Sequence, residues 1–379
     1  MIYKKFQDLE LSALGLGAMR LPTIGGQEGC IDEDATRGMV DYCMKNGINY
    51  YDTAYGYHNG QSELVMGRIL KEYPRDSFYL ASKFPGYDPA NIPKGQEIFE
   101  EQLKKCQVEY FDFYLFHNVN AANIDPYLDD ESNGLYSYLM EQKKNGRIRH
   151  LGFSVHGDYD ITKRFLEAYG KDMEFCQIQL NWIDYDYQEA KRKIELLGEY
   201  NIPVWVMEPL RGGKLATLRE EYAVKLRALR PDETIPGWAF RFLQTIPTVG
   251  MILSGMSGFE QLQQNIATFQ TEEPLSETEW DALMEIKAEM FNDKTLPCTS
   301  CRYCTSYCPQ GLDIPALISL YNDQALTSKD LAVPAWMLGS IPEDKWPSAC
   351  IGCRSCEAVC PQEIKISGMM TAFAAAIQK

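Results

Sequence analysis

The sequence predicts an α/β protein with a second, smaller domain, and two observations carry this prediction. Short apolar runs alternate with amphipathic helical segments before residue 290, and eight of the twelve cysteines lie in the last 82 residues. Alternating strands and helices indicate parallel strands that helices cover on the outside. A cysteine-rich end indicates a metal-binding segment. We therefore expect one domain at residues 1–290 and another at residues 291–379.

Eight strand-like runs precede the cysteine-rich end, which favours a closed (β/α)8 barrel, or TIM barrel, over an open sheet. They cover residues 14–19, 48–53, 78–83, 111–117, 148–155, 175–181, 203–207 and 250–254. Helical patterns between them cover residues 34–45, 62–72, 93–108, 135–145, 188–200 and 259–268. A small hairpin around residues 8–11 is expected under the barrel.

Charge and composition exclude several classes of protein. The formal net charge is −16, and an acidic surface repels phosphate backbones, so we expect no nucleic-acid partner. No uncharged apolar run reaches the roughly 18 residues that a membrane helix needs, and the first residues lack the apolar core of a signal peptide. We expect a cytoplasmic protein, in which cysteines stay reduced and form no disulfide framework.

The clustered cysteines form two copies of one motif. Each copy has three cysteines at two-residue gaps, then a fourth after three residues, followed by proline: Cys298, Cys301, Cys304 and Cys308, then Cys350, Cys353, Cys356 and Cys360. Both copies resemble the runs of bacterial two-cluster ferredoxins, which implies two [4Fe–4S] clusters. The implied ligand sets are Cys298, Cys301 and Cys304 with Cys360, and Cys350, Cys353 and Cys356 with Cys308.

Zinc is the alternative, because paired CxxC motifs can hold it tetrahedrally. Two full copies that each end in proline favour the clusters. The 41 residues between the copies include a helical pattern at residues 314–325, so we expect a mainly helical ferredoxin-like domain.

Polar residues stand where three of the predicted barrel strands end. The second strand runs into Asp52 and Tyr57, the third ends at Lys83, and the fourth ends at His117. Active sites of (β/α)8 barrels lie at this carboxyl edge. A charged lysine near the barrel core needs a partner, and Asp52 can supply it.

Over roughly residues 1–290 the chain resembles the aldo/keto reductase family, and Asp52, Tyr57, Lys83 and His117 match its catalytic tetrad in order. The resemblance implies that Tyr57 donates a proton to a carbonyl oxygen and that Lys83, held by Asp52, lowers the pKa of this tyrosine. His117 would orient the carbonyl. Tyr55 is an alternative acid, but the five-residue spacing from Asp52 favours Tyr57. Taken singly, each residue could be structural, as a buried ion pair or a core histidine.

The same resemblance implies a nicotinamide cofactor, NAD(P)(H), although only some of the family's cofactor-binding residues are matched in this sequence. Ser154 and Gln177 match residues that hold the nicotinamide amide, but Val155 replaces an asparagine and Met207 replaces the tyrosine that stacks on the ring. The remaining matches lie in the loops after the last two strands and in the following helix: Leu210, Arg211, Gly212, Gly213, Gly255, Ser257, Gln261, Gln264 and Asn265.

Three features qualify this cofactor assignment. The first strand is not followed by a GxGxxG motif, so no Rossmann domain is indicated. The loop at Arg211, Gly212 and Gly213 has two interpretations, a plain turn or a loop that covers the pyrophosphate of the cofactor. Gly258 stands where many family members carry a basic residue against the 2′-phosphate, which weakens the case for NADP.

Three hypotheses for the function remain open. The first is an NAD(P)H-dependent reductase of a small carbonyl substrate, whose clusters are structural or serve a redox partner such as ferredoxin or flavodoxin. The second is a reductase that uses a flavin such as FMN, whose phosphate would lie in the loops after strands seven and eight. The third is an electron-transfer protein in which the barrel is a docking scaffold. An intact tetrad favours the first.

Overall fold

The computed structural model describes residues 1–296, 298, 302, 304–327, 333–334, 338, 341–360 and 362–378. The chain divides into two compact units, Met1–Trp280 and Asp281–Lys379. This division falls inside one helix, α13 (Glu277–Lys294), and the boundary expected at residue 290 falls inside the same helix.

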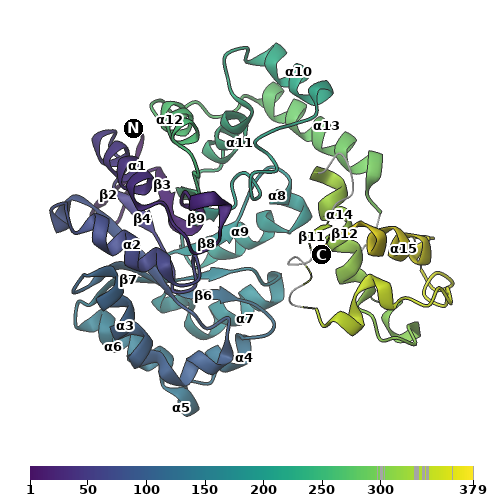
Figure 1. The fold of residues 1–379 in the computed structure, drawn as a ribbon, viewed down its shortest axis with the longest axis horizontal. Coiled ribbons are helices and arrows are strands. Elements are labelled where there is room, and N and C mark those ends of the chain that lie inside the picture. The colour runs from purple at the N-terminus through teal and green to yellow at the C-terminus, as the bar shows by residue number, and fades with distance from the viewer. Residues whose placement is uncertain are drawn as a thin grey trace. The chain divides into compact units, whose positions relative to one another are not determined.

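Eight parallel strands close into a barrel in the first unit (Figure 1). Going round the barrel, each strand pairs with its neighbours in the chain, and the last strand pairs with the first. The predicted barrel is therefore confirmed. The strands are β3 (Leu14–Gly17), β4 (Tyr50–Asp52), β5 (Tyr79–Phe84), β6 (Phe111–Val119), β7 (Ile148–Val155), β8 (Cys176–Gln179), β9 (Val204–Met207) and β10 (Val249–Ser254).

Helices surround the barrel (Figure 1). The longer ones are α1 (Glu33–Lys45), α2 (Gln61–Leu70), α3 (Gly95–Cys106), α6 (Leu135–Lys144), α7 (Tyr159–Tyr169), α9 (Ala190–Glu199), α10 (Glu220–Leu229), α11 (Ile235–Gln244) and α12 (Phe259–Thr268). The short ones are α4 (Ile124–Leu128), α5 (Asp130–Asn133) and α8 (Asp184–Tyr187). The 3₁₀ turns described in the first unit are Ala18–Arg20, Ile24–Gly26, Arg75–Ser77, Pro89–Lys94 and Gly170–Asp172. Those in the described part of the second unit are Thr305–Tyr307, Glu343–Lys345 and Pro347–Ala349.

The helices α7, α10, α11 and α13 were not predicted, although two of them begin at clear capping residues. The side chain of Asp158 accepts a hydrogen bond from the backbone of Ile161 before α7, and Thr234 does the same for Gly237 before α11. Such caps compensate backbone N–H groups that a helix leaves without partners.

A hairpin of β1 (Tyr3–Phe6) and β2 (Leu9–Ser12) packs against the amino-terminal end of the barrel. The ring of Phe6 lies 5.6 Å from Phe113, 5.1 Å from His150 and 5.1 Å from Trp205, measured between centroids. Contacts between aromatic rings at such distances stabilise a core beyond their area burial. The expected hairpin is therefore present and it closes this end.

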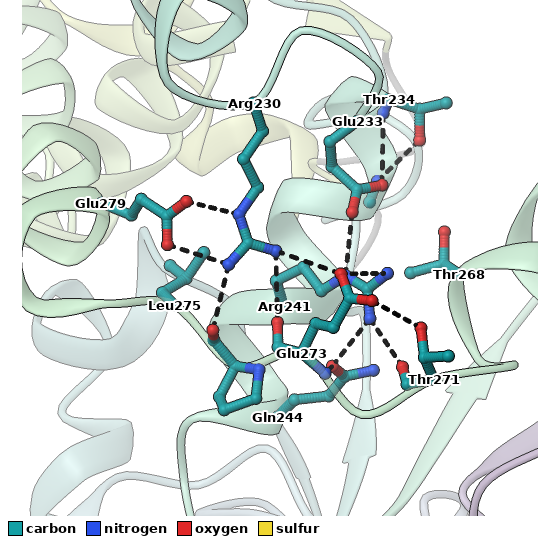
Figure 2. Close-up of polar contacts among 12 residues, drawn as sticks. Arg230, Glu233, Thr234, Arg241, Gln244, Thr268, Thr271, Glu273, Leu275 and Glu279 are labelled. Atoms are coloured by element: carbon teal, nitrogen blue, oxygen red, sulfur yellow. Dashed lines mark hydrogen bonds and ion pairs between the residues drawn. The ribbon is translucent and has the colours of Figure 1, made fainter.

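A network of ion pairs fixes the last part of the first unit (Figure 2). Arg230 donates to both carboxylate oxygens of Glu279, and Arg241 donates to Glu233 at 2.8 Å. Glu279 also accepts the backbone N–H of Ser276 at 2.8 Å, while the Ser276 hydroxyl accepts the N–H of Glu279. This capping box begins α13.

A second polar cluster lies at the start of β7 and centres on Glu174. Its carboxylate accepts hydrogen bonds from His150 at 2.7 Å and Gln7 at 2.6 Å, and it pairs with Lys143 at 2.6 Å. Burial alone would raise the pKa of Glu174, but these donors outweigh burial and lower this pKa to about 2.

The Glu174 cluster predicts a pH dependence of stability. Because the folded-state pKa lies below its ordinary value, the carboxylate stabilises the fold above about pH 4.5 and loses this effect as the pH falls toward 2. We expect Glu174→Gln to lower the free energy of unfolding at pH 7 by about 1–3 kcal/mol. At pH 3 the loss should be smaller. Urea titrations followed by circular dichroism measure both values.

The matched control is Glu167→Gln, which changes an exposed carboxylate on α7. It should leave the free energy of unfolding nearly unchanged at both pH values. An equal loss at pH 3 and pH 7 for Glu174→Gln would contradict the stated role of its charge.

The described part of the second unit is mainly helical, as expected. It contains α14 (Ile314–Thr327) and α15 (Ile366–Ala376), with a short parallel pair of β11 (Val333–Pro334) and β12 (Ile377–Gln378). The predicted helix at residues 314–325 is thus confirmed. The core of this unit includes Leu312, Leu317, Ile318, Met370 and Phe373 together with Cys304 and Cys356.

Among the described residues, no helix combines the length and the apolar character that a membrane span requires.

Candidate functional site

The carboxyl ends of β4, β5 and β6 bring the four predicted catalytic residues together. Lys83 Nζ donates to Asp52 Oδ1 at 2.6 Å and to the Thr53 carbonyl at 2.8 Å, and it lies 3.2 Å from the Tyr57 hydroxyl. The His117 ring lies 6.0 Å from the Tyr57 ring, measured between centroids. Lys83 is 1% exposed and Asp52 is 3% exposed, so their charges compensate each other inside the protein.

Burial and charge act in opposite directions on Tyr57. Burial raises the pKa of its hydroxyl, the ammonium group of Lys83 lowers it, and burial prevails. Lys83 thus acts in the expected direction, but the net shift of this pKa is upward rather than downward. At neutral pH Tyr57 therefore holds its proton, as a proton donor must.

Burial also decides the charge of His117. It lowers the pKa of the imidazole well below its ordinary range, and the nearby charge of Lys83 lowers it further. The ring is therefore neutral at pH 7. Its Nδ1 atom is buried and has no hydrogen-bond partner among the described residues.

The structure separates Tyr57 from the alternative acid Tyr55. The Tyr55 hydroxyl donates to Glu101 at 3.0 Å, and Lys105 Nζ lies 4.0 Å from the centre of its ring. Tyr55 is therefore engaged with helix α3, whereas Tyr57 contacts Lys83.

A buried hydrogen-bond network, which was not predicted, lies behind Lys83. The amide nitrogen of Gln102 donates to the Lys83 carbonyl at 3.0 Å and to Glu63 at 2.7 Å. Ser82 donates to the same Glu63 oxygen at 2.6 Å, and Tyr114 donates to the amide oxygen of Gln102 at 2.5 Å. Helices α2 and α3 thereby fix the end of β5 that carries Lys83.

A cavity of about 370 Å³ opens at the tetrad and extends to α12. This volume lies in the range of small-molecule and cofactor sites. Asp52 and Tyr57 form part of its wall at one end. Most of the predicted cofactor contacts also line it: Gln177, Met207, Leu210, Gly212, Gly213, Gly255, Ser257, Gln261, Gln264 and Asn265.

Two predicted cofactor contacts do not belong to this wall. The Ser154 hydroxyl accepts the backbone N–H of Asn118 at 2.8 Å, and Arg211 Nε lies 3.2 Å from the carboxylate of Asp184. Both side chains support the loops around the cavity in the structure as it stands.

The wall contains two charged residues that were not predicted as contacts, Arg20 and Glu208. Glu208 has a left-handed backbone with φ 57°, and its carbonyl accepts from Asn181 Nδ2 at 3.0 Å. Burial raises the pKa of its carboxyl group, while Arg20 opposes this rise. In the sequence, the one signal for Glu208 was its place directly after Met207, which replaces the tyrosine that stacks on the ring.

The cavity wall fits a ligand that carries an amide and phosphate groups. The side-chain oxygen of Gln177 is buried and has no hydrogen-bond partner among the described residues, so a ligand amide could donate to it. Gly212 and Gly213 have positive φ values of 66° and 91°, and a Cβ atom at Gly213 would meet nothing within 4 Å. The Gly213 N–H donates to the Leu210 carbonyl at 3.0 Å, so the two glycines offer a phosphate open space beside the loop with no side chain in the way.

In the second unit, one hollow is walled by a whole predicted ligand set, Cys308, Cys350, Cys353 and Cys356. No three potential ligands among the described residues converge closely enough for a single metal ion. Four thiols at one hollow match the ligand number of a [4Fe–4S] cluster, whose irons bind four cysteines at separate corners. In the other set, Cys298, Cys304 and Cys360 are described, whereas Cys301 lies outside the described residues.

Comparison with known proteins agrees with both units. Residues 13–288 match the model of the Aldo/keto reductase family, and residues 297–364 match that of the 4Fe-4S dicluster domain. The chain belongs to the aldo/keto reductase family. It is an oxidoreductase of this type with an iron–sulfur domain, so both resemblances seen in the sequence are confirmed.

Individual relatives cover about two thirds to three quarters of this chain. The NADH-specific methylglyoxal reductase of Escherichia coli strain K12 is 24% identical over 306 residues, which cover 69% of this chain and 90% of that protein. An aldo-keto reductase from Bacillus halodurans, in its holo form, is 25% identical with a TM-score of 0.60, covering 75% of this chain and 96% of that one. An aldo-keto reductase from Klebsiella pneumoniae in complex with NADPH is 20% identical with a TM-score of 0.58, covering 76% and 96%.

The cysteine hollow predicts the effect of removing one ligand. We expect Cys308→Ala to lower the iron content from about eight to about four atoms per chain, because one [4Fe–4S] cluster loses a thiolate. Iron and sulfide assays on anaerobically purified protein measure this change. The control Cys30→Ala alters an exposed cysteine of the barrel unit and should retain all the iron. Full iron content in Cys308→Ala would contradict the assigned ligand set.

Proposed function

We propose that this protein reduces a small aldehyde or ketone with NAD(P)H at the tetrad, and that its two [4Fe–4S] clusters exchange electrons with a separate redox partner. The observation that carries the proposal is the buried contact of Lys83 with both Asp52 and Tyr57, which form part of the cavity wall.

Each residue of the tetrad has a task that follows from its surroundings. A nicotinamide supplies a hydride to the carbonyl carbon when it is bound. Tyr57, protonated at neutral pH, gives its proton to the carbonyl oxygen. Lys83 stabilises the phenolate that this transfer leaves, and Asp52 keeps Lys83 charged. The neutral His117 hydrogen-bonds the carbonyl oxygen and sets its direction.

The cavity wall supplies the groups that would hold the cofactor. The unpaired oxygen of Gln177 would accept from the nicotinamide amide, and the loop at Gly212 and Gly213 would hold the phosphates. Ser257 and Gln264, at the α12 end of the cavity, would contact the adenosine.

The clusters require a redox partner because a nicotinamide in the barrel and the iron–sulfur clusters transfer different numbers of electrons per step. Nicotinamides transfer two electrons as a hydride, whereas an iron–sulfur cluster passes one electron at a time. A small carrier such as ferredoxin or flavodoxin handles single electrons. A flavin in the barrel would also join the two processes, but neither matching family model describes a flavin domain.

The two tyrosines give a matched pair of variants that tests the reaction. We expect Tyr57→Phe to lower kcat by about 10²–10⁴-fold, because the carbonyl oxygen loses its proton donor. Tyr55→Phe removes a hydroxyl bonded to Glu101 and should keep most of the activity. Methylglyoxal, the substrate named for the Escherichia coli relative, is a suitable first probe. Unchanged turnover in Tyr57→Phe would contradict the proposal and favour a scaffold role for the barrel.

A spectroscopic experiment tests the role of the clusters. We expect dithionite to bleach the visible iron–sulfur absorption of the anaerobic protein, and NADH or NADPH alone to leave it unchanged. Bleaching by either nicotinamide would instead show that hydride oxidation feeds the clusters. A flavin, released by denaturation and detected by its fluorescence, would then have to be present.

A further inference from the structure

One predicted ligand of the cysteine hollow in the second unit reaches the surface. Cys353 is exposed, whereas the other three cysteines of this hollow are buried or half-buried. Of the cysteines that the structure describes in the other ligand set, none is exposed. Electron transfer between proteins slows steeply with distance, so an exposed ligand gives an electron a short path to a cluster. Among the described ligands, Cys353 therefore marks the point where an outside protein comes nearest.

Two large apolar side chains are exposed at the rim of the same hollow. Tyr307 is 55% exposed and Ile351 is 63% exposed, and both line the hollow. No other large apolar side chain in the described part of the second unit is exposed. Scattered exposed apolar residues are ordinary, but here both stand directly beside a predicted cluster ligand in the chain. Aromatic and large apolar side chains are typical of the centre of a protein–protein interface.

The charged side chains at this rim are cationic. Among the described residues that line the hollow, Arg354 alone carries a charge, and it is exposed. Lys365 is exposed directly before α15, whose first residues, Ile366 and Ser367, also line the hollow. Within the described part of the chain, neither Arg354 nor Lys365 forms an ion pair.

Glu357 shows that these two cations lie near each other. Its carboxylate accepts the N–H of Ser367 at 2.7 Å and the hydroxyl at 2.5 Å, and these bonds lower the pKa of Glu357 most. The charges of Arg354 and Lys365 lower this pKa further, so both stand close to the same carboxylate. Other charged neighbours of the hollow pair among themselves: Arg302 with Asp313 at 2.8 Å, and Lys345 with Asp344 at 3.9 Å.

The sign of the exposed charges indicates which partner this surface suits. A cluster bound by four thiolates is itself negative, so it would repel an acidic protein that approached it. Arg354 and Lys365 stand in the solvent at the place of approach, where they offset this repulsion and attract carboxylates. A basic protein would instead meet these two cations directly.

We propose that Tyr307, Ile351, Cys353, Arg354 and Lys365, named here the Cys353 face, form the docking surface for a small one-electron carrier protein with an acidic surface. The proposal rests on the proposed function, since it requires electron exchange with a separate partner. In the transfer the carrier is oxidised by one electron and the cluster is reduced by one, and no covalent bond forms or breaks. The contact is small, as is typical of electron-transfer encounters.

The test uses the full-length, anaerobically purified protein with oxidised clusters, and a fully reduced flavodoxin as the acidic carrier. After rapid mixing, the flavin of the carrier loses one electron and gains a new visible absorption band, whose appearance gives a second-order rate constant. We expect this rate constant to fall about 10-fold or more when the salt concentration rises from about 50 mM to about 500 mM, because salt screens the attraction of opposite charges.

Two variants of the Cys353 face separate charge from apolar contact. Arg354→Glu should lower the rate constant about 10-fold at low salt and much less at high salt, because its effect is electrostatic. Ile351→Ser should lower it about 5-fold at both salt concentrations, because salt does not screen an apolar contact. The control Arg164→Glu makes the same charge change at an exposed arginine of α7 and should change it less than about 2-fold.

Lys365→Glu keeps the test independent of the ligand loops, since Lys365 lies outside both cysteine motifs. It should lower the rate constant about 3-fold or more at low salt. Iron assays on every variant establish that both clusters are present. If Arg354→Glu loses iron, Lys365→Glu decides the role of charge.

Three results would overturn the inference, and each is distinct. Equal rate constants in Lys365→Glu, Arg354→Glu and the control would remove the docking surface, while electron exchange with a separate carrier would stand. Clusters that dithionite reduces but flavodoxin does not would overturn both this inference and the partner in the proposed function. A dimer in sedimentation velocity that Ile351→Ser separates would show that a second copy of this chain covers the Cys353 face.

Discussion

Lys83 brings an ammonium group into the interior of the barrel, and Asp52 provides the carboxylate that compensates its charge at 2.6 Å. A buried charge without a partner is strongly destabilising. The spacing of β4 and β5 is therefore under a strict constraint at this point, because the two side chains must meet. The Thr53 carbonyl and the Tyr57 hydroxyl occupy further positions around the ammonium group. The hydroxyl of Tyr57, the proposed proton donor, is thus held by the same ammonium group whose charge Asp52 compensates.

The network of Glu63 and Gln102 extends this constraint to the helices. Gln102 bonds the Lys83 carbonyl, and Glu63 receives donors from both Ser82 and Gln102. The positions of helices α2 and α3, together with those of the strands, therefore determine where Lys83 lies. Such support from outer residues holds a reactive group within the small tolerance that its chemistry allows.

The parts of the fold that the sequence predicts are those with strong local patterns. Strand β7 and helix α12 coincide with predicted residues 148–155 and 259–268. The alternation of strands and helices that supports such predictions stops between β9 and β10, where α10 and α11 follow each other without a strand. Neither of these two helices was predicted. The four proposed catalytic residues could be picked out in the sequence because each lies at, or shortly after, the end of a predicted strand. Glu208 and Arg20 could not, because 188 positions separate them and only the folded barrel brings them to one cavity.

The iron–sulfur unit has its own constraint, since its core includes predicted ligand cysteines such as Cys304 and Cys356. Cluster binding and folding are therefore coupled in this unit. Cys353, by contrast, is exposed, and so are its neighbours from Ile351 to Ser355. A cluster bound by Cys353 would have this ligand at the surface, where dissolved oxygen could reach it without any opening of the protein. For a cluster held at this loop, stability toward air would depend on this exposed segment and not on how stable the barrel is to heat or denaturant.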